Sequence, residues 1–336
     1  EAYYSIDYAD RFKELFGELY IGQHPTKRHN SYMVLRFNFS AISSKLEDVE
    51  RSFSEYCCMV MKNFILKYEH LMGSDVWKVV NPDETNPRQM LSALKEYVSR
   101  TDCPRIYLLI DEYDNFTNTI LSSYGQERYR EKTHGEGFIR GFFNNIKDST
   151  SNADAAVERL FITGVSPITM DDVTSGFNIG TNISMLPEFN SVIGFSMEEM
   201  REMVSYYKSE SALPADMTVD GLIETMKPWY DNYCFSSWNL DEKVFNSDMA
   251  LYFLNSYLLR KRAPEMMIDS NIRTDYNKLR HLVQIDKRFG ANASVIQQII
   301  AEGSITAQIA TSFPAEKMAD TENFKSLLFY FGMLSI

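Results

Sequence analysis

Two adjacent carboxylates, Asp111 and Glu112, follow directly on the continuous apolar run Ile106 to Ile110. Such a run is typical of a strand that is buried on both faces of a parallel sheet. Open α/β sheets bind their ligands at the carboxyl edge, so both acids are predicted to lie at a binding edge. In nucleoside triphosphatases this is the Walker B arrangement: the Asp holds Mg²⁺ through water and the Glu polarises the attacking water. Taken alone, the pair is also compatible with a turn or the start of a helix.

A second group of polar residues follows another apolar run. Leu160 to Ile162 leads into Thr163, a glycine and Ser166. If this strand is the neighbour of the acid-bearing strand, Thr163 and Ser166 lie beside the acids, where polar side chains sense the γ-phosphate in many ATPases. A strand followed by an ordinary turn is the alternative for this segment by itself. Asp114 lies in the string IDEYDN, which contains both acids. It is predicted to orient the residues of the site without itself contacting the ligand.

The elements that must position these residues alternate between strands and helices, which is typical of α/β units. Apolar residues from Leu46 to Phe64 recur at spacings of three and four and predict a long amphipathic helix. Ser44 and Glu47 form a capping-box pattern before it. Pro87 suits the first turn of the next helix. Parallel strands are expected at 33–39, 106–111 and 159–164, with a further candidate strand at 191–195.

The second half of the sequence contains almost only helical patterns. Ser196 and Glu199 form a capping box at the start of the first of them. The later helical patterns lie at 222–229, 249–259, 279–285, 295–300 and 324–331. A length of 336 residues suits two domains. We therefore expect an α/β core over residues 1–196 and a helical lid or linker region over residues 197–336.

The composition excludes several classes of protein. An apolar content of 44% is enough to build a core, so wholesale disorder is excluded. The net charge of -12 argues against generic binding to a phosphate backbone, so direct binding of nucleic acid by this chain is not expected. Four cysteines without a CxxC pair favour a reduced, cytoplasmic setting. No apolar run of membrane-spanning length and no signal peptide is found, so no membrane partner is expected.

Arg140 and Arg159 are interpreted as surface arginines rather than as fingers on a γ-phosphate.

Several motifs together resemble the AAA-ATPase-like family of bacterial proteins, whose members are often fused to a C-terminal PD-(D/E)XK-type nuclease domain. The resemblance covers essentially the whole chain and rests on six segments: VLRFNFS (34–40), LLIDEYDN (108–115), FITGVSPI (161–168), FNIGTNIS (177–184), PEFNSVIGFSMEEM (187–200) and WYDNYCFS (229–236). The last segment is similar to the family's WYxGYxF, with Asn232 at the position of the glycine.

This resemblance implies a P-loop-NTPase-like, three-layer α/β fold with a helical lid, and a function in binding and hydrolysing ATP with Mg²⁺. By the same resemblance Asp111 is the acid on the side of Mg²⁺, Glu112 the catalytic base and Thr163 the sensor, while Asp114 and Ser166 belong to the cofactor site. A downstream nuclease domain is the expected partner. An alternative function stays open, in which the chain is a nucleotide-switched regulatory or interaction module that controls a nuclease-type effector.

The phosphate-binding loop of the family, GxxxxGK[ST], is not found in this sequence, because none of the 15 glycines is followed by lysine. Glu1 to Tyr4 look like the body of the helix that follows this loop. We therefore expect an incomplete sheet without its first strand, with an open edge beside the Thr163 strand, in a fragment that also lacks the nuclease. Without the amides and the lysine of the loop, the chain is expected to bind nucleotide poorly, which leaves its enzymatic activity open.

Overall fold

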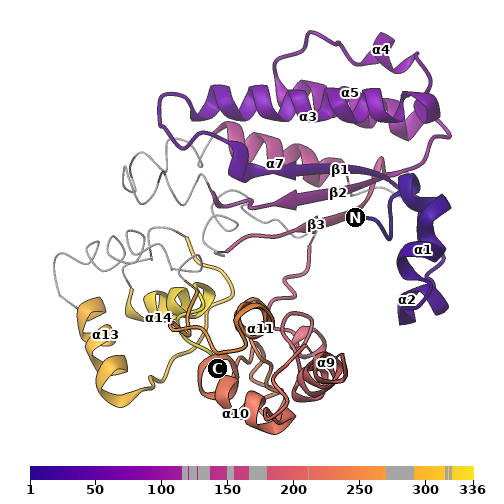
Figure 1. The fold of residues 1–336 in the computed structure, drawn as a ribbon. Helices are drawn as coiled ribbons and strands as arrows, with labels where there is room; N and C mark the ends of the chain where they lie inside the picture. The colour runs from indigo at the N-terminus through magenta and orange to yellow at the C-terminus, as the bar shows by residue number, and fades with distance from the viewer. Residues whose placement is uncertain are drawn as a thin grey trace. The chain divides into compact units, whose positions relative to one another are not determined.

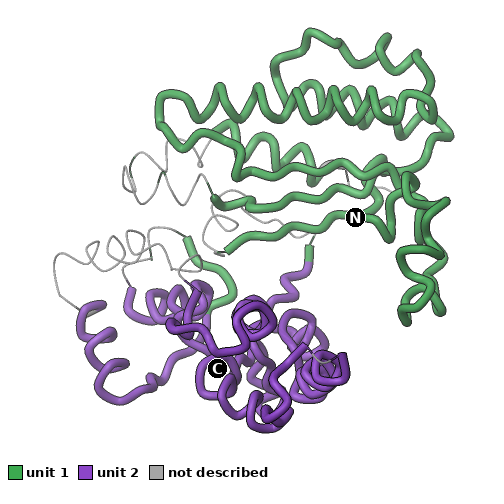
Figure 2. Tube along the Cα trace, in the orientation of Figure 1, with its two compact units in different colours: residues 1–180, 310–318 green, residues 181–309, 319–336 purple. Residues whose placement is uncertain are grey.

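The computed structural model describes residues 1–115, 120, 127, 137–149, 155–165, 180–210, 212–269, 291–314, 317 and 320–336. Ser166 and the helix expected at 279–285 lie outside the described residues. The chain divides into two compact units, one of residues 1–180 and 310–318 and the other of residues 181–309 and 319–336 (Figure 2). The domain boundary expected at residue 196 stays a prediction.

The first unit is built on a three-stranded parallel sheet of order β1-β2-β3 (Figure 1). The strands are β1 (Met33–Asn38), β2 (Ile106–Asp111) and β3 (Val157–Ile162). Leu108 of β2 pairs with Leu35 of β1 on one side and with Leu160 of β3 on the other. The three expected strands and their parallel direction are confirmed. The strand that ends in Asp111 is the hydrogen-bonded neighbour of the strand that leads to Thr163, as predicted.

Three helices, α3 (Val49–Met72), α5 (Pro87–Arg100) and α7 (Phe138–Ser149), lie together on one side of the sheet (Figure 1). Successive strand side chains point to opposite faces, and in β2 the side chains of Ile106, Leu108 and Ile110 are buried. The rings of Phe37, Phe39, Phe53, Phe142 and Phe143 form an aromatic cluster between this face and helices α3 and α7. The alternate residues of β2 are half-exposed on the other face. The described part of the first unit therefore shows a sheet and one helical layer, and the third expected layer stays a prediction.

Strand β3 is paired only with β2 in the part of the chain that the structure describes. Two apolar side chains, one in this strand and one in the loop after it, are exposed: Phe161 is 45% exposed and Val165 42%. An unpaired strand edge presents free N–H and C=O groups to the surroundings. The open edge expected beside the Thr163 strand stays a prediction.

Helix α3 begins later than its sequence pattern predicts. The capping box predicted at Ser44 and Glu47 is wrong, because the helix begins at Val49 with Asp48 at its N-cap and no side-chain cap bond. The chain before it is held as a loop, in which the Ser43 N–H donates to the Ser52 hydroxyl at 3.0 Å. Helix α5 does begin at Pro87, and the Asn86 side chain caps it.

The amino-terminal segment is not helical at Glu1–Tyr4, so that prediction is wrong. Residues 2–4 form a turn, and Ser5 pairs with Tyr32 just ahead of β1. The Asn30 side chain donates to the carbonyls of Ala2 and Ser5 at 3.0 and 2.6 Å, which satisfies backbone groups that a helix would otherwise pair. The short elements of this unit are η1 (Ile6–Arg11), α1 (Phe12–Phe16), α2 (Tyr20–Gln23), η2 (Phe39–Ala41) and α4 (Val76–Val79).

The second unit is mostly helical in its described part. Its elements are η3 (Pro187–Phe189), α9 (Met197–Ser209), α10 (Val219–Tyr230), α11 (Ser247–Arg260), α13 (Ala291–Glu302) and α14 (Thr321–Tyr330). Helices α9, α10 and α11 bury a common apolar core that includes Met200, Leu222 and Phe253. The capping box of Ser196 and Glu199 is confirmed.

The strand predicted at 191–195 is wrong. These residues form bends, with one isolated antiparallel bridge from Phe195 to Phe245. Gly194 adopts a φ of 116°, which an L-residue rarely reaches and which breaks the extended pattern. No helix in the described part of the chain is both long and apolar enough to cross a bilayer.

Candidate functional site

Asp111 and Thr163 meet where β2 and β3 end. The backbone pairing of the two strands continues past β3, because the Thr163 N–H donates to the Ile110 carbonyl at 2.8 Å and the Tyr113 N–H to the Thr163 carbonyl at 3.1 Å. The Thr163 hydroxyl donates to Oδ1 of Asp111 at 2.7 Å. Two polar side chains from distant parts of the sequence therefore share the carboxyl edge of the sheet, where parallel α/β sheets bind ligands.

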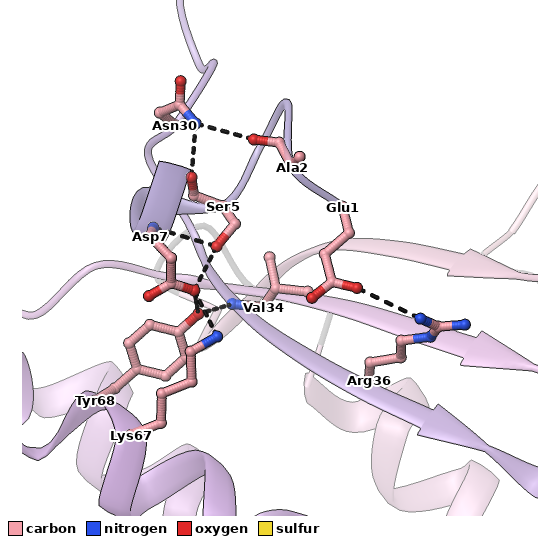
Figure 3. A network of polar contacts seen from close by, with 9 residues as sticks. All are labelled: Glu1, Ala2, Ser5, Asp7, Asn30, Val34, Arg36, Lys67 and Tyr68. Carbon is pink, nitrogen blue, oxygen red and sulfur yellow. Dashed lines mark hydrogen bonds and ion pairs between the residues drawn. The ribbon is translucent and has the colours of Figure 1, made fainter. Parts of the chain in front are cut away.

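Arg36 of β1 occupies the other carboxylate oxygen of Asp111. Its Nη2 lies 3.2 Å from Oδ2 of Asp111. Its Nη1 lies 3.5 Å from the Glu1 carboxylate, a contact that Figure 3 shows. The hydrogen bond from Thr163, followed by the contacts with Arg36, lowers the pKa of Asp111 despite its partial burial. Asp111 is therefore ionised at neutral pH, as a ligand of a divalent cation must be.

Arg36 is a residue that the sequence reasoning missed. The sequence does contain a signal for it, because Arg36 is the one charged residue in the otherwise mostly apolar strand β1. In the register of the sheet Arg36 pairs with Leu109, which stands on the same face as Asp111. A charge at that place in a buried strand indicates a polar partner on the neighbouring strand.

Glu112 has a backbone conformation that is uncommon for its residue type. Its φ is 56°, in the left-handed region that mainly glycine, asparagine and aspartate adopt. Asn115 holds this turn, because its N–H donates to the Glu112 carbonyl at 3.1 Å and its Nδ2 to Oε2 of Glu112 at 3.2 Å. Such conformations cost about 1–3 kcal/mol and cluster at functional sites. The strained residue here is the acid that the sequence motif assigns to catalysis.

The turn after β2 and the loop after β3 are in close contact at Asp114 and Gly164. Asp114 is fully buried, and its Oδ1 accepts the Val165 N–H at 3.1 Å. A Cβ atom at Gly164 would come within 2.5 Å of that oxygen and within 2.3 Å of the Tyr113 ring. Asp114 is thus a positioning residue in this structure. Ser166, the other residue predicted at the cofactor site, lies outside the described residues.

The oxygen atoms at this edge fit a hard cation. Mg²⁺ is usually held by one or two carboxylates together with several waters, and Ser or Thr hydroxyl oxygens can also be its ligands. Asp111 and Thr163 offer a carboxylate and a hydroxyl in contact. Among the described residues, no three His, Cys, Asp or Glu side chains gather to hold a metal. The donor set fits a water-rich Mg²⁺ site and does not fit an enclosed metal cage built from these residues.

A network around Asp7 fixes the amino-terminal segment that carries Glu1 (Figure 3). Its Oδ2 accepts hydrogen bonds from the Tyr68 hydroxyl at 2.6 Å and the Ser5 hydroxyl at 2.7 Å, and it lies 2.5 Å from the Lys67 ammonium. The Tyr68 hydroxyl in turn accepts the Val34 N–H at 3.2 Å. Desolvation raises the pKa of Asp7, but the hydrogen bonds from Lys67, Tyr68 and Ser5 outweigh it, and the net shift is downward. The network joins the segment to α3 and β1.

Replacing Asp7 by Asn is expected to destabilise the first unit at neutral pH and to matter less in acid. Because the folded-state pKa is lowered, the stabilisation by Asp7 is fully present above its unfolded pKa and is lost as the pH falls through the folded pKa. The side chain is 24% exposed, so screening keeps the expected loss at about 1 kcal/mol at pH 7. Urea unfolding at about pH 7 and pH 3 measures it. Asp10→Asn, an exposed neighbour, is the control, and an equal loss in both variants contradicts the role of the network.

The fold and the site define an α/β protein with an acidic carboxyl edge, and a family comparison is consistent with this class. A family model described as a predicted AAA-ATPase, AAA-ATPase_like, matches residues 1–174, just over half of the chain. The chain belongs to the AAA-ATPase-like family. The match spans all three strands of the sheet, with Asp111, Glu112 and Thr163. No curated protein and no solved structure matches the chain.

Proposed function

We propose that the carboxyl edge of the β1-β2-β3 sheet is the metal- and water-positioning part of an ATP-hydrolysing site. The observation that carries the proposal is the contact between the Thr163 hydroxyl and the Asp111 carboxylate, which joins the two motif segments at the edge where α/β sheets bind ligands. The family match and the strained turn at Glu112 support it. The corresponding fold is a P-loop-NTPase-like sheet, incomplete in this chain, with the helical second unit as its lid.

Each residue has a distinct part in this proposal. Mg²⁺, when bound, supplies charge neutralisation on the phosphate oxygens. Asp111 would hold the cation with its ionised carboxylate, and the Thr163 hydroxyl, which donates to Oδ1, fixes the orientation of that carboxylate. Glu112 would accept a proton from the attacking water as its oxygen bonds to the γ-phosphorus and the bond from that phosphorus to the departing ADP oxygen breaks. Asp114 keeps the loop of Thr163 in place through the Val165 N–H.

The affinity of this chain for nucleotide is proposed to be weak. No GxxxxGK[ST] segment is present in the 336 residues, so the backbone cradle and the lysine that bind the β- and γ-phosphates must be supplied from elsewhere. The edge favours a magnesium ion over free phosphate, because its carboxylates attract a cation. Its arginine, Arg36, is already paired with the two carboxylates of Asp111 and Glu1.

A second candidate function is a nucleotide-controlled switch for a nuclease-type effector. Arg36 favours it, because this residue bridges Asp111 and Glu1 and so links the site to the amino-terminal segment. A cation on Asp111 competes with Arg36 for the same carboxylate oxygen, and the released guanidinium is left with Glu1. Binding of nucleotide without turnover favours the switch, whereas steady turnover favours the ATPase.

The metal part of the proposal is tested with Mn²⁺ as a paramagnetic substitute for Mg²⁺. Asp111→Ala is expected to weaken Mn²⁺ binding by at least about tenfold, the lower end of the loss typical even for outer partners of a metal site. Asp48→Ala is the matched control, because Asp48 is also paired with an arginine, Arg51, at 2.6 Å. Electron paramagnetic resonance counts the free Mn²⁺ in both titrations. Equal affinities in the two variants overturn the assignment of Asp111.

A further inference from the structure

A pocket of about 210 Å³ lies in the first unit, at the opposite end of the strands from Asp111 and Thr163. It is lined by Tyr4, Thr26, Lys27, Arg28, Tyr107 and Arg159. Tyr107 stands at the start of β2, and its register partner on β3 is Arg159. Four residues of strand, or about 13 Å at the usual rise per residue, separate Tyr107 from Asp111. The pocket is therefore a separate site from the carboxyl edge of the sheet.

The pocket gathers positive charge in a chain whose net charge is -12. Three of its lining side chains are cations. Arg28 is paired with Glu158 at 3.1 Å. The Tyr32 hydroxyl, which accepts a hydrogen bond from Arg159, raises the pKa of that guanidinium further. Lys27 forms no ion pair or side-chain hydrogen bond with any other described residue. The lining residues include three cations and no carboxylate, and Glu158 pairs with only one of those cations, so the pocket keeps an excess of positive charge.

Neighbouring residues fix the walls of the pocket in advance. The Thr26 N–H donates to the Tyr3 hydroxyl at 2.8 Å, and that hydroxyl donates back to Oγ1 of Thr26 at 3.3 Å, so the loop with Lys27 is tied to the amino-terminal turn. The rings of Tyr4 and Tyr107 lie with their centroids 5.3 Å apart in a tilted contact. Both tyrosines line the pocket, so its lining combines aromatic rings with cations.

We propose that this pocket binds the phosphate group of a small molecule. Lys27, Arg28 and Arg159 supply charge-assisted hydrogen-bond donors, which prefer phosphate oxygens, and the tyrosine rings cover the organic part next to the phosphate. The volume is below the roughly 300–1,000 Å³ of sites for drug-sized ligands, so a phosphate monoester or pyrophosphate fits better than a large cofactor. The proposal does not depend on the ATP-hydrolysing site.

Calorimetric titration of the 336-residue chain without magnesium tests this site, with pyrophosphate as the probe. Lys27→Ala is expected to weaken binding by about tenfold, since one charged hydrogen bond is lost. Glu158→Gln is expected to tighten binding, because it removes the carboxylate that competes for Arg28 while an amide oxygen remains to accept from the Tyr32 hydroxyl. Lys45→Ala, an exposed lysine in a loop of the same unit, is the control and is expected to bind like the parent chain. Circular dichroism verifies that each variant is folded.

A comparison of inorganic phosphate with phenyl phosphate tests the aromatic side of the pocket. Tighter binding of phenyl phosphate supports a contact between its ring and the rings of Tyr4 and Tyr107. Equal affinities overturn that contact. The site itself is overturned if Lys27→Ala and Lys45→Ala weaken pyrophosphate binding equally, since the attraction is then diffuse. It is also overturned if Asp111→Ala changes the affinity as much as Lys27→Ala does, or if the parent chain binds none of the three probes.

Discussion

Glu112→Gln is expected to reduce ATP hydrolysis by about 10²- to 10⁴-fold, the usual contribution of a general base, and to leave ATP affinity unchanged. Glutamine has the size of glutamate, and its amide oxygen can still accept the hydrogen bond that Asn115 Nδ2 makes to Oε2. The substitution removes only the capacity to take a proton from water. A loss in kcat without a loss in binding is the signature of a group that acts in the transition state.

The experiment needs a chain in which the phosphate-binding loop is present, since the 336 residues contain no glycine followed by lysine. A version extended by a GxxxxGK[ST] loop provides the reference rate, and nucleotide binding is measured separately by a fluorescent ATP analogue. Glu47→Gln, an exposed loop residue of the same unit, is the matched control and is expected to keep the parental rate. Hydrolysis by Glu112→Gln at the parental rate shows that Glu112 is not the base.

The sheet could be predicted from the sequence because its signals are local. The run Ile106 to Ile110 is apolar at every position, and the structure places it in the middle of the sheet, where both neighbours are strands. The proximity of Thr163 to Asp111 also followed from local signals, once the two strands were assumed to be neighbours. Parallel strands end at the same edge, so the residues that follow them must meet there.

The errors arise where contacts with residues outside the motif override the local pattern. Ser44 and Glu47 match a capping box, but the bond between Ser43 and Ser52 holds the chain as a loop, so the helix begins only at Val49. The amino-terminal turn depends on Asn30, a side chain more than twenty residues away in the sequence. Propensity in a short window cannot contain such partners.

The candidate site shows the same limit. The acids and Thr163 were found from motifs, whereas the ion pair between Arg36 and Asp111 depends on the register between β1 and β2. The left-handed φ of Glu112 has no sequence signal, because nothing in its residue type favours it. The part of the site that joins separate segments, and the strain within it, therefore had to come from the structure.

Gly164→Ala is expected to destabilise the first unit by about 2 kcal/mol, a typical cost of adding one methyl group to a filled space. The new Cβ would lie 2.3 Å from two carbons of the Tyr113 ring and 2.5 Å from Oδ1 of Asp114. Neither group can yield easily, since Tyr113 is 7% exposed and the Asp114 oxygen is bound to the Val165 N–H. The cost is steric, because Gly164 does not have a positive φ.

Gly73→Ala is the control that separates crowding from backbone strain. Gly73 has a φ of 84°, and the nearest atom to its added Cβ is the Tyr97 hydroxyl at 3.8 Å, so only strain of about 1 kcal/mol is expected there. Without crowding, alanine at Gly164 would be neutral or stabilising by about 0.4–1 kcal/mol, because it reduces the entropy of the unfolded chain. Urea unfolding gives the two losses, and hydrogen exchange of the β2 and β3 amides shows whether they fall in the sheet. A smaller loss at Gly164 than at Gly73 would mean that the loop moves away at little cost. In that case Asp114 would not hold Thr163 against Asp111.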